Sequence, residues 1–106
     1  MMKLEDFGAL IKANALFDDV AADMQKLHDQ IGYRRLIDQQ IASADSIAAN
    51  IEEGFGRSRS KEYAQFLVYS RGSTQETRDR YGRMKHWLPK KIVSLDRHFV
   101  TRLSKP

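Results

Sequence analysis

The residues of this 106-residue chain that are best suited to chemistry are its cations, and they suit contact with a polyanion. Arg71, Arg78 and Lys85 recur every seven residues, so a helix would carry them on one stripe. No acidic residue shares that stripe, whereas a solvated helix face usually mixes both signs. Such a stripe can follow a phosphate backbone and release its counterions. An ordinary solvated helix face is the alternative interpretation.

A second group of cations stands where a helix is expected to begin, at Arg57, Arg59 and Lys61. Free N–H groups and the helix dipole favour anions there, although a solvated charged turn is equally consistent with the pattern. Tyr81 and Trp87 lie among the cations further along and could stack on unpaired bases. The residues predicted to bind nucleic acid are Arg57, Arg59, Lys61, Arg71, Arg78, Arg83, Lys85, Lys90 and Lys91.

Patterns typical of catalysis are missing. The three histidines, His28, His86 and His98, share no spacing of three or four residues, and the chain has no cysteine. Gly54-Phe55-Gly56 is a lone G-x-G without the lysine of a phosphate-binding loop. Glu52 and Glu53 would diverge by roughly 100° on a helix and form no acid–base pair. We therefore expect that the protein is not an enzyme. We also expect no catalytic residue, no metal and no cofactor.

Charge divides the chain into two halves. Residues 1–56 carry five basic and ten acidic residues, whereas residues 57–106 carry thirteen basic and four acidic ones. This division favours an anionic partner and assembly between unlike surfaces. No apolar run approaches the ~20 residues of a membrane span, and the N-terminus lacks the apolar core of a secretion signal. We expect a cytoplasmic protein without a membrane partner.

The apolar spacing predicts one all-α domain over residues 1–106, an up-down-up-down four-helix bundle with a short fourth helix. The first helix is expected to end at Gly32, and the second to run over about 33–53 and end at Gly54 and Gly56. The third is expected to run from a Ser60 cap, or a Ser58 cap, to about residue 86. The fourth would follow Pro89 and cover about 92–103.

Each expected helix has a stripe for the core. The predicted stripe of the first helix consists of Leu10, Ala13, Phe17, Val20, Met24, Leu27 and Ile31. That of the second consists of Ile37, Ile41, Ala44, Ala48, Ile51 and Phe55, with Ile47 beside them. That of the third consists of Phe66, Ser70, Ser73, Thr77, Arg80, Met84 and Trp87, with Tyr63 and Tyr81 alongside.

The third stripe is polar in its middle. Two interpretations stand: close helix approach at Ser70, Gly72 and Ser73 with locally bonded hydroxyls, or contact with a second subunit. Arg80 must reach water or a carboxylate, because an unpaired buried charge costs several kcal/mol or more. Glu52, Glu53 and Glu76 are its candidate partners. Both a structural salt bridge and a functional arginine are open at this point.

Three blocks resemble a known bacterial family: SIAANIEEGFGR at 46–57, KEYAQFL at 61–67 and RGSTQET at 71–77. They look like the four-helix-bundle proteins encoded by intervening sequences in large-subunit ribosomal RNA genes, which are similar to the accessory variability protein of diversity-generating retroelements. The motif matches include Asn50, Glu53, Gly54, Arg57 and Glu76. Together with the turn glycine and the arginine discussed above, the predicted structural-motif residues are Asn50, Glu53, Gly54, Gly56, Glu76 and Arg80.

The resemblance implies an up-down bundle assembled as a homo-oligomer, commonly a ring-shaped homopentamer. It also implies association with nucleic acid, and with a reverse transcriptase or another protein partner, in place of catalysis. Within the motif, we expect Asn50 and Glu53 to tie the second helix to its neighbours. Arg57 would be either their partner or an RNA contact. An adaptor bundle that only mediates protein assembly is the alternative function.

Overall fold

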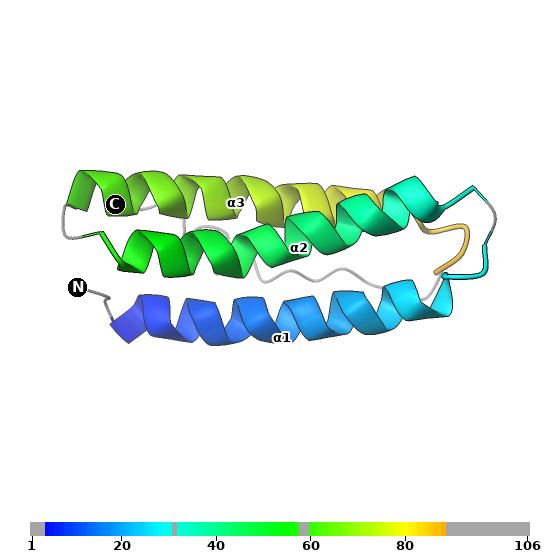
Figure 1. Cartoon of the computed structure of the whole chain (residues 1–106), viewed down its shortest axis with the longest axis horizontal. Coiled ribbons are helices and arrows are strands. Elements are labelled where there is room, and N and C mark those ends of the chain that lie inside the picture. The colour runs from blue at the N-terminus through cyan, green and yellow to red at the C-terminus, as the bar shows by residue number, and fades with distance from the viewer. Residues whose placement is uncertain (1–3, 31, 58–59, 89–106) are drawn as a thin grey trace.

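The computed structural model describes residues 4–30, 32–57 and 60–88, which form three α-helices. These are α1 (Leu4–Lys26), α2 (Arg34–Phe55) and α3 (Ser60–Arg83), and the described residues contain no strand (Figure 1). The expected all-α class is confirmed, with three helices in place of four among these residues. The predicted fourth helix, over about 92–103, lies outside the described residues.

The helices run antiparallel in sequence order, and α2 packs against both α1 and α3 (Figure 1). Helices α1 and α3 meet through side chains: the Tyr81 hydroxyl donates a hydrogen bond to Asp23 Oδ2 at 2.5 Å. Tyr33 and Trp87 join the start of α2 to the turn after α3, with ring centroids 3.7 Å apart. Both contacts lie at the end of the bundle where α1 and α3 finish and α2 begins, and they fix that end across the helices.

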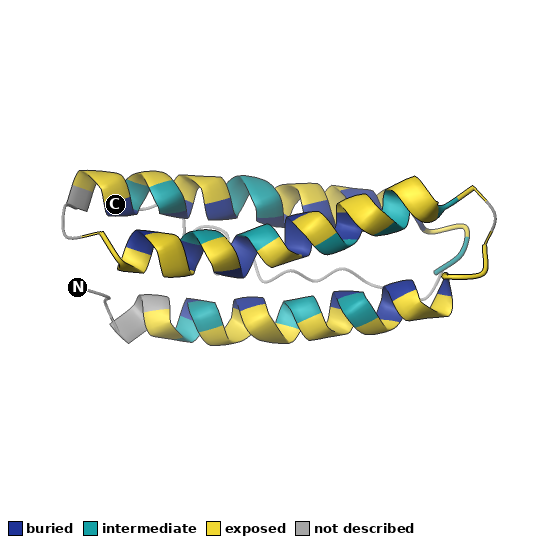
Figure 2. Cartoon of the chain, viewed as in Figure 1, coloured by how far each residue is buried: buried dark blue, intermediate teal, exposed yellow. Residues whose placement is uncertain are grey.

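The core stripes of α1 and α2 largely follow the prediction (Figure 2). Ala13, Val20, Met24 and Leu27 are buried on α1, with Ala9 added, whereas Leu10 and Phe17 are half-buried. On α2 the predicted Phe55 is wrong, because its side chain is 43% exposed at the end of the helix. The buried residues of α2 are Gln40, Ser43, Ala44, Ile47, Ala48, Ile51 and Gly54.

The core stripe predicted for α3 is confirmed in part. The buried residues of this segment are Tyr63, Leu67, Ser70, Thr74, Thr77, Arg80, Tyr81 and Met84, while the predicted Phe66, Ser73 and Trp87 are half-buried. Tyr63 and Leu67 enter the cluster around Ile51. Polar Thr74 fits this stripe because its hydroxyl donates to the Ser70 carbonyl oxygen at 2.8 Å. The centre of the stripe therefore consists of small polar side chains whose hydroxyls are already bonded.

Two predicted helix boundaries differ from those in the structure. Helix α1 ends at Lys26, five residues before the expected position, and Gly32 adopts a left-handed φ of +92° in the connection to α2. Gly54 does not end α2, which continues to Phe55. A Cβ at Gly54 would lie 2.8 Å from Phe66 Cβ, so glycine is needed there for the close approach of α2 to α3. Gly72, by contrast, has no neighbour within 4 Å of such an atom, which excludes close approach at that residue.

Candidate nucleic-acid interface

The basic stripe is defined here as Arg71, Arg78 and Lys85. Arg78 and Lys85 are exposed, and Arg71 is half-buried. Lys85 lies in the turn after α3, where the Met84 amide still donates to the Arg80 carbonyl oxygen at 3.1 Å and continues the helical pattern. At ~1.5 Å rise per residue, neighbouring stripe residues stand ~10.5 Å apart and the stripe spans ~21 Å. That length equals about six steps along one strand of B-DNA.

The stripe lies on a flank of α3. Ser70 donates to the Ile47 carbonyl oxygen at 2.8 Å and Thr77 bonds the Ser43 hydroxyl at 2.7 Å, so these residues mark the side of α3 that faces α2. The stripe is turned from that side by roughly a third of a turn. No acidic residue of α3 occupies the flank.

The other cations predicted to bind nucleic acid differ in whether they are exposed and unpaired. Lys61 and Arg83 are exposed. Arg57 is exposed too, but it donates to Glu53 Oε1 at 2.7 Å, and its guanidinium lies 5.2 Å from the centroid of the Phe66 ring. Of the two roles expected for Arg57, the structure thus shows the partner of Glu53. Arg59, Lys90 and Lys91 lie outside the described residues.

The aromatic residues near the stripe are already engaged. Tyr81 is buried and bonded to Asp23, and burial, followed by that hydrogen bond and the charges of Asp23 and Asp19, raises the pKa of its hydroxyl. Trp87 packs on Tyr33. Neither ring is presented for stacking on a base. The stripe is therefore suited to phosphate contact without base stacking.

Arg80 is buried, and its contacts were not foreseen. Its NH1 group lies 2.9 Å from Gln40 Oε1, 2.9 Å from Ser43 Oγ and 3.3 Å from the Gln39 carbonyl oxygen. Gln40 is held in turn by its Nε2, which donates to the Thr77 carbonyl oxygen at 2.9 Å. Of the three candidate carboxylates, Glu52 and Glu53 are wrong, whereas Glu76 forms a long ion pair with Arg80, 3.9 Å between Oε2 and NH2. Gln40 and Ser43 were missed because they are polar, although their spacing of three on one helix face was a usable signal.

The other motif residues act locally. Asn50 was expected to tie α2 to its neighbours, but its amide donates to the Ser46 carbonyl oxygen of the same helix at 2.8 Å. Glu53 pairs with Arg57 four residues on, also locally. Gly56 follows α2, and its N–H donates to the carbonyl oxygens of Glu52 and Glu53 at 3.3 and 3.2 Å. These contacts shape the α2–α3 corner that leads to the stripe.

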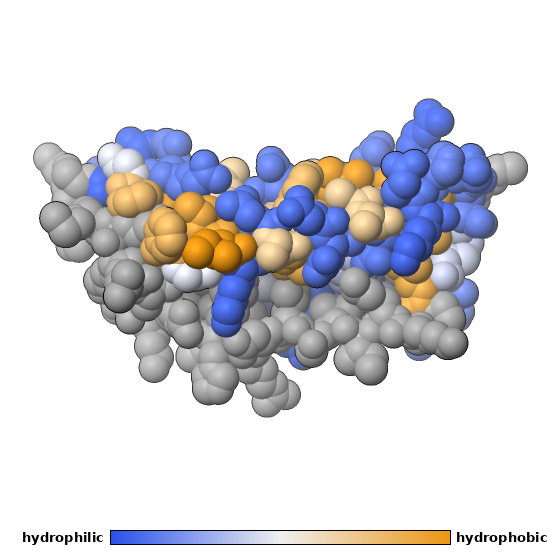
Figure 3. All heavy atoms as spheres, turned by 90° about the horizontal axis from the view of Figure 1, so that it is seen from below, coloured by the Kyte–Doolittle hydropathy of each residue, from blue (hydrophilic) through white to orange (hydrophobic). Residues whose placement is uncertain are grey.

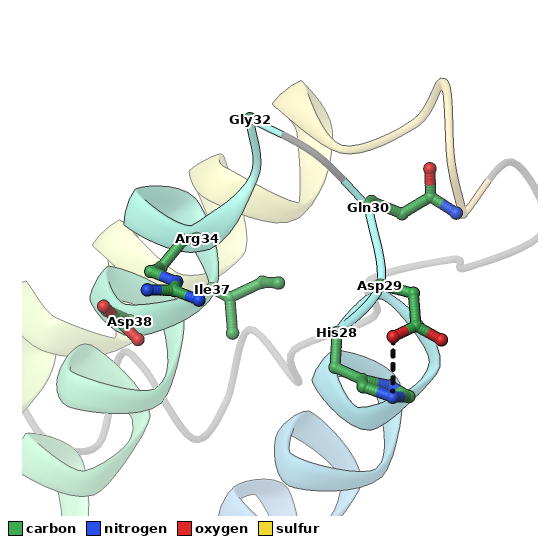
Figure 4. Close-up of a pocket in the computed structure, with 7 residues that line it drawn as sticks. All are labelled: His28, Asp29, Gln30, Gly32, Arg34, Ile37 and Asp38. Carbon is green, nitrogen blue, oxygen red and sulfur yellow. Dashed lines mark ion pairs between the residues drawn. The ribbon is translucent and has the colours of Figure 1, made fainter.

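A separate cavity of about 640 Å³ opens at the α1–α2 connection (Figure 4). The His28 ring lies with Nε2 3.1 Å from Asp29 Oδ1 and Nδ1 2.6 Å from the Gln25 carbonyl oxygen. This contact between sequence neighbours was not expected. Arg34 and Asp38 contribute opposite charges to the lining, so the cavity offers no uniform field to a phosphate.

The charge division of the sequence is carried by whole helices. Helix α1 has two basic and five acidic residues, α2 has two and four, and α3 has five and three. The candidate interface is therefore the exposed part of the one described helix with a positive balance.

None of the described helices has a stretch long and apolar enough to cross a membrane.

The model of the family described as 23S rRNA-intervening sequence protein matches residues 5–86. The chain belongs to that family. The match includes all three helices apart from the first residue of α1, as well as the whole stripe. No curated protein and no solved structure matches the chain.

Proposed function

We propose that this member of the 23S rRNA-intervening sequence protein family is a non-enzymatic, oligomeric accessory protein of the cytoplasm that binds RNA or DNA through phosphate contacts. The observation that supports the proposal is the stripe of Arg71, Arg78 and Lys85, which lies on a flank of α3 without acidic residues. Lys61 and Arg83 add exposed charge to the same helix. Because Tyr81 and Trp87 are engaged in contacts within the bundle, binding should depend weakly on sequence.

The stripe defines the expected salt dependence. Three phosphate contacts on duplex DNA correspond to a slope of about −2.7 in log K against log salt, or about a 40-fold loss of affinity between 50 and 200 mM salt. On single-stranded RNA the same contacts give a slope of about −2.1 and a loss of about 18-fold. An oligomer that engages several subunits would steepen both slopes.

The test is a salt titration of nucleic-acid binding with two matched double variants. Arg78→Gln with Lys85→Gln should reduce the slope on duplex DNA by about 1.8 per subunit engaged, because two contacts are lost. Arg34→Gln with Arg35→Gln removes the same charge from exposed positions on α2 and should leave the slope nearly unchanged. Equal slopes for the two double variants would show that the contact surface lies elsewhere.

Assembly is part of the proposal. The acidic balance of α1 and α2 and the basic balance of α3 suit head-to-tail contact between copies, and such contacts form rings when they close. A homopentamer is what the family resemblance implies, and a reverse transcriptase or another protein partner belongs to the same expectation. Light scattering at micromolar concentration should give a multiple of the 12.2 kDa chain mass, and a monomer would refute the assembly.

An adaptor without nucleic-acid binding is the second candidate, and exposed apolar residues of α1 favour it. Phe7 and Ile11 are 53% and 57% exposed, and hydrophobic atoms come to the surface on the α1 side of the molecule (Figure 3). Such residues suit a protein partner better than a phosphate. Absence of RNA and DNA retention at 50 mM salt would decide for the adaptor.

A further inference from the structure

A groove of about 260 Å³ runs between α2 and α3, on the side of α3 away from the basic stripe. Arg80 lines it together with the serine hydroxyls of Ser43, Ser46 and Ser73, and the Glu76 side chain stands beside it, 63% exposed. Arg80 and Arg78 are two residues apart and project roughly 160° from each other around the helix. One phosphate backbone running along the stripe therefore cannot reach this groove in the same subunit.

Arg80 brings a largely buried positive charge to the groove. Its side chain is only 9% exposed, yet its NH1 contacts are all with neutral oxygen atoms, on Gln39, Gln40 and Ser43. Its Nε is buried and has no hydrogen-bond partner. Glu76 is the single carboxylate within 4 Å of the guanidinium among the described residues, at 3.9 Å from NH2. Neutral acceptors satisfy hydrogen bonds without supplying charge, and the exposed Glu76 carboxylate, at 3.9 Å, offsets the desolvation of the buried guanidinium only in part.

The groove supplies the groups that an oxyanion needs. A guanidinium presents donors in a planar fork that matches phosphate oxygens, and hydroxyls can rotate to donate to the same group. The Ser46 and Ser73 side chains belong to this lining. The volume lies below the ~300–1,000 Å³ of pockets that enclose drug-sized ligands. It therefore suits one small anionic group and its waters, with the rest of any larger molecule outside.

We propose that the groove between α2 and α3 is a binding site for a single phosphate group, with Arg80 as its charged donor and Ser46 and Ser73 as hydroxyl donors. The phosphate is either the free anion or the end of a small phosphomonoester. Glu76 opposes binding electrostatically and limits the affinity to weak, millimolar values. The site is independent of the proposed nucleic-acid surface, because it uses none of the stripe residues.

The test is a titration of the full chain with inorganic phosphate, followed by NMR at the Arg80 Nε–H and the amides of Ser43 and Ser73. Sodium chloride holds the ionic strength constant, which separates binding from the general stabilising effect of phosphate salts. A nucleoside 5′-monophosphate is titrated in parallel. Tighter binding of inorganic phosphate identifies the free anion as the ligand, and tighter binding of the nucleotide identifies a phosphomonoester.

Three variants make the titration decisive. Arg80→Gln should weaken phosphate binding at least tenfold, while Arg35→Gln, an exposed charge on α2 outside the groove, should leave it nearly unchanged. Glu76→Gln should tighten binding about fivefold, the factor for removing one unit charge about 4 Å away across water. Glu76 is exposed, so this variant tests the proposal even if Arg80→Gln does not fold.

Loss of nucleic-acid binding in the Arg78→Gln and Lys85→Gln double variant, with phosphate binding retained, would show that the two sites are separate. The groove proposal is overturned if wild-type protein shows no saturable shift with phosphate. It is equally overturned if Glu76→Gln binds phosphate more weakly than wild type does.

Discussion

Substituting Gly54 by alanine tests the close approach of α2 to α3 at this residue. The added Cβ would lie 2.8 Å from Phe66 Cβ and 3.2 Å from Tyr63 Cδ1. Phe66 Cβ is attached directly to the α3 backbone and cannot rotate away, so the two helices must separate at this corner. Overpacking of this kind costs about 1–3 kcal/mol. Alanine also favours the helix over glycine by up to about 1 kcal/mol, which partly offsets that cost.

Gly82→Ala is the matched control. Gly54 is the penultimate residue of α2 and Gly82 the penultimate residue of α3, so the gain in helix propensity should be similar. A Cβ at Gly82 would have no neighbour within 4 Å. The difference between the variants therefore isolates the contact, at about 1–3 kcal/mol, or a gap of at least about 4 °C in melting temperature followed by circular dichroism. Equal melting temperatures would refute the close approach of α2 to α3.

Three further predictions concern the core. Ile51→Asp should abolish the helical circular dichroism signal, because it places an unpaired carboxylate at a fully buried position; a stable helical variant would contradict this. Ser70→Ala should lower the free energy of unfolding by about 1 kcal/mol in urea titrations, since the hydroxyl bond to Ile47 is lost, and an unchanged midpoint would contradict it. The raised pKa of Tyr81 means that the unfolded chain releases this proton first, so stability should fall above about pH 10 by up to ~1.4 kcal/mol per pH unit. Tyr81→Phe should remove that component of the pH dependence.

The sequence predicts α1 and α2 well because their buried residues are mostly apolar. Val20, Met24 and Ile51 follow the three-and-four spacing that burial on one helix face requires, and all three are buried. Helix α3 is predicted less completely: Ser70 and Thr77 lie on the expected stripe and are buried, but the buried Leu67 and Thr74 were not placed on it. With small polar residues at its centre, hydrophobic periodicity does not fix the position of this stripe around the helix. The burial of such residues depends on hydroxyl bonds to carbonyl oxygens, and the bond from Ser70 to Ile47 crosses to another helix.

Glycine and arginine show why the site was less predictable than the fold. Gly54 is equally suited to ending a helix and to letting a neighbour approach, and only the position of Phe66 decides between them. Because a buried charge favours a counter-charge, a carboxylate partner was expected for Arg80, but its closest contacts are neutral groups of α2. Both outcomes depend on which residues of two helices meet. The spacing of residues along one helix does not show which residues of a second helix they meet.

The arginines of this chain also show why a count of basic residues overstates the charge available to a nucleic acid. Arg57 is exposed but paired with Glu53, and Arg80 is directed into the α2–α3 groove. Arg78 has neither restriction, since it is exposed on a flank without acidic neighbours along α3. Contact with the backbone of a nucleic acid requires a cation that is both solvent-facing and uncompensated, and among the described residues the stripe with Lys61 and Arg83 best meets that condition. The positive field of α3 is thus divided between an outer surface suited to a polyanion and an inner groove suited to one small anion.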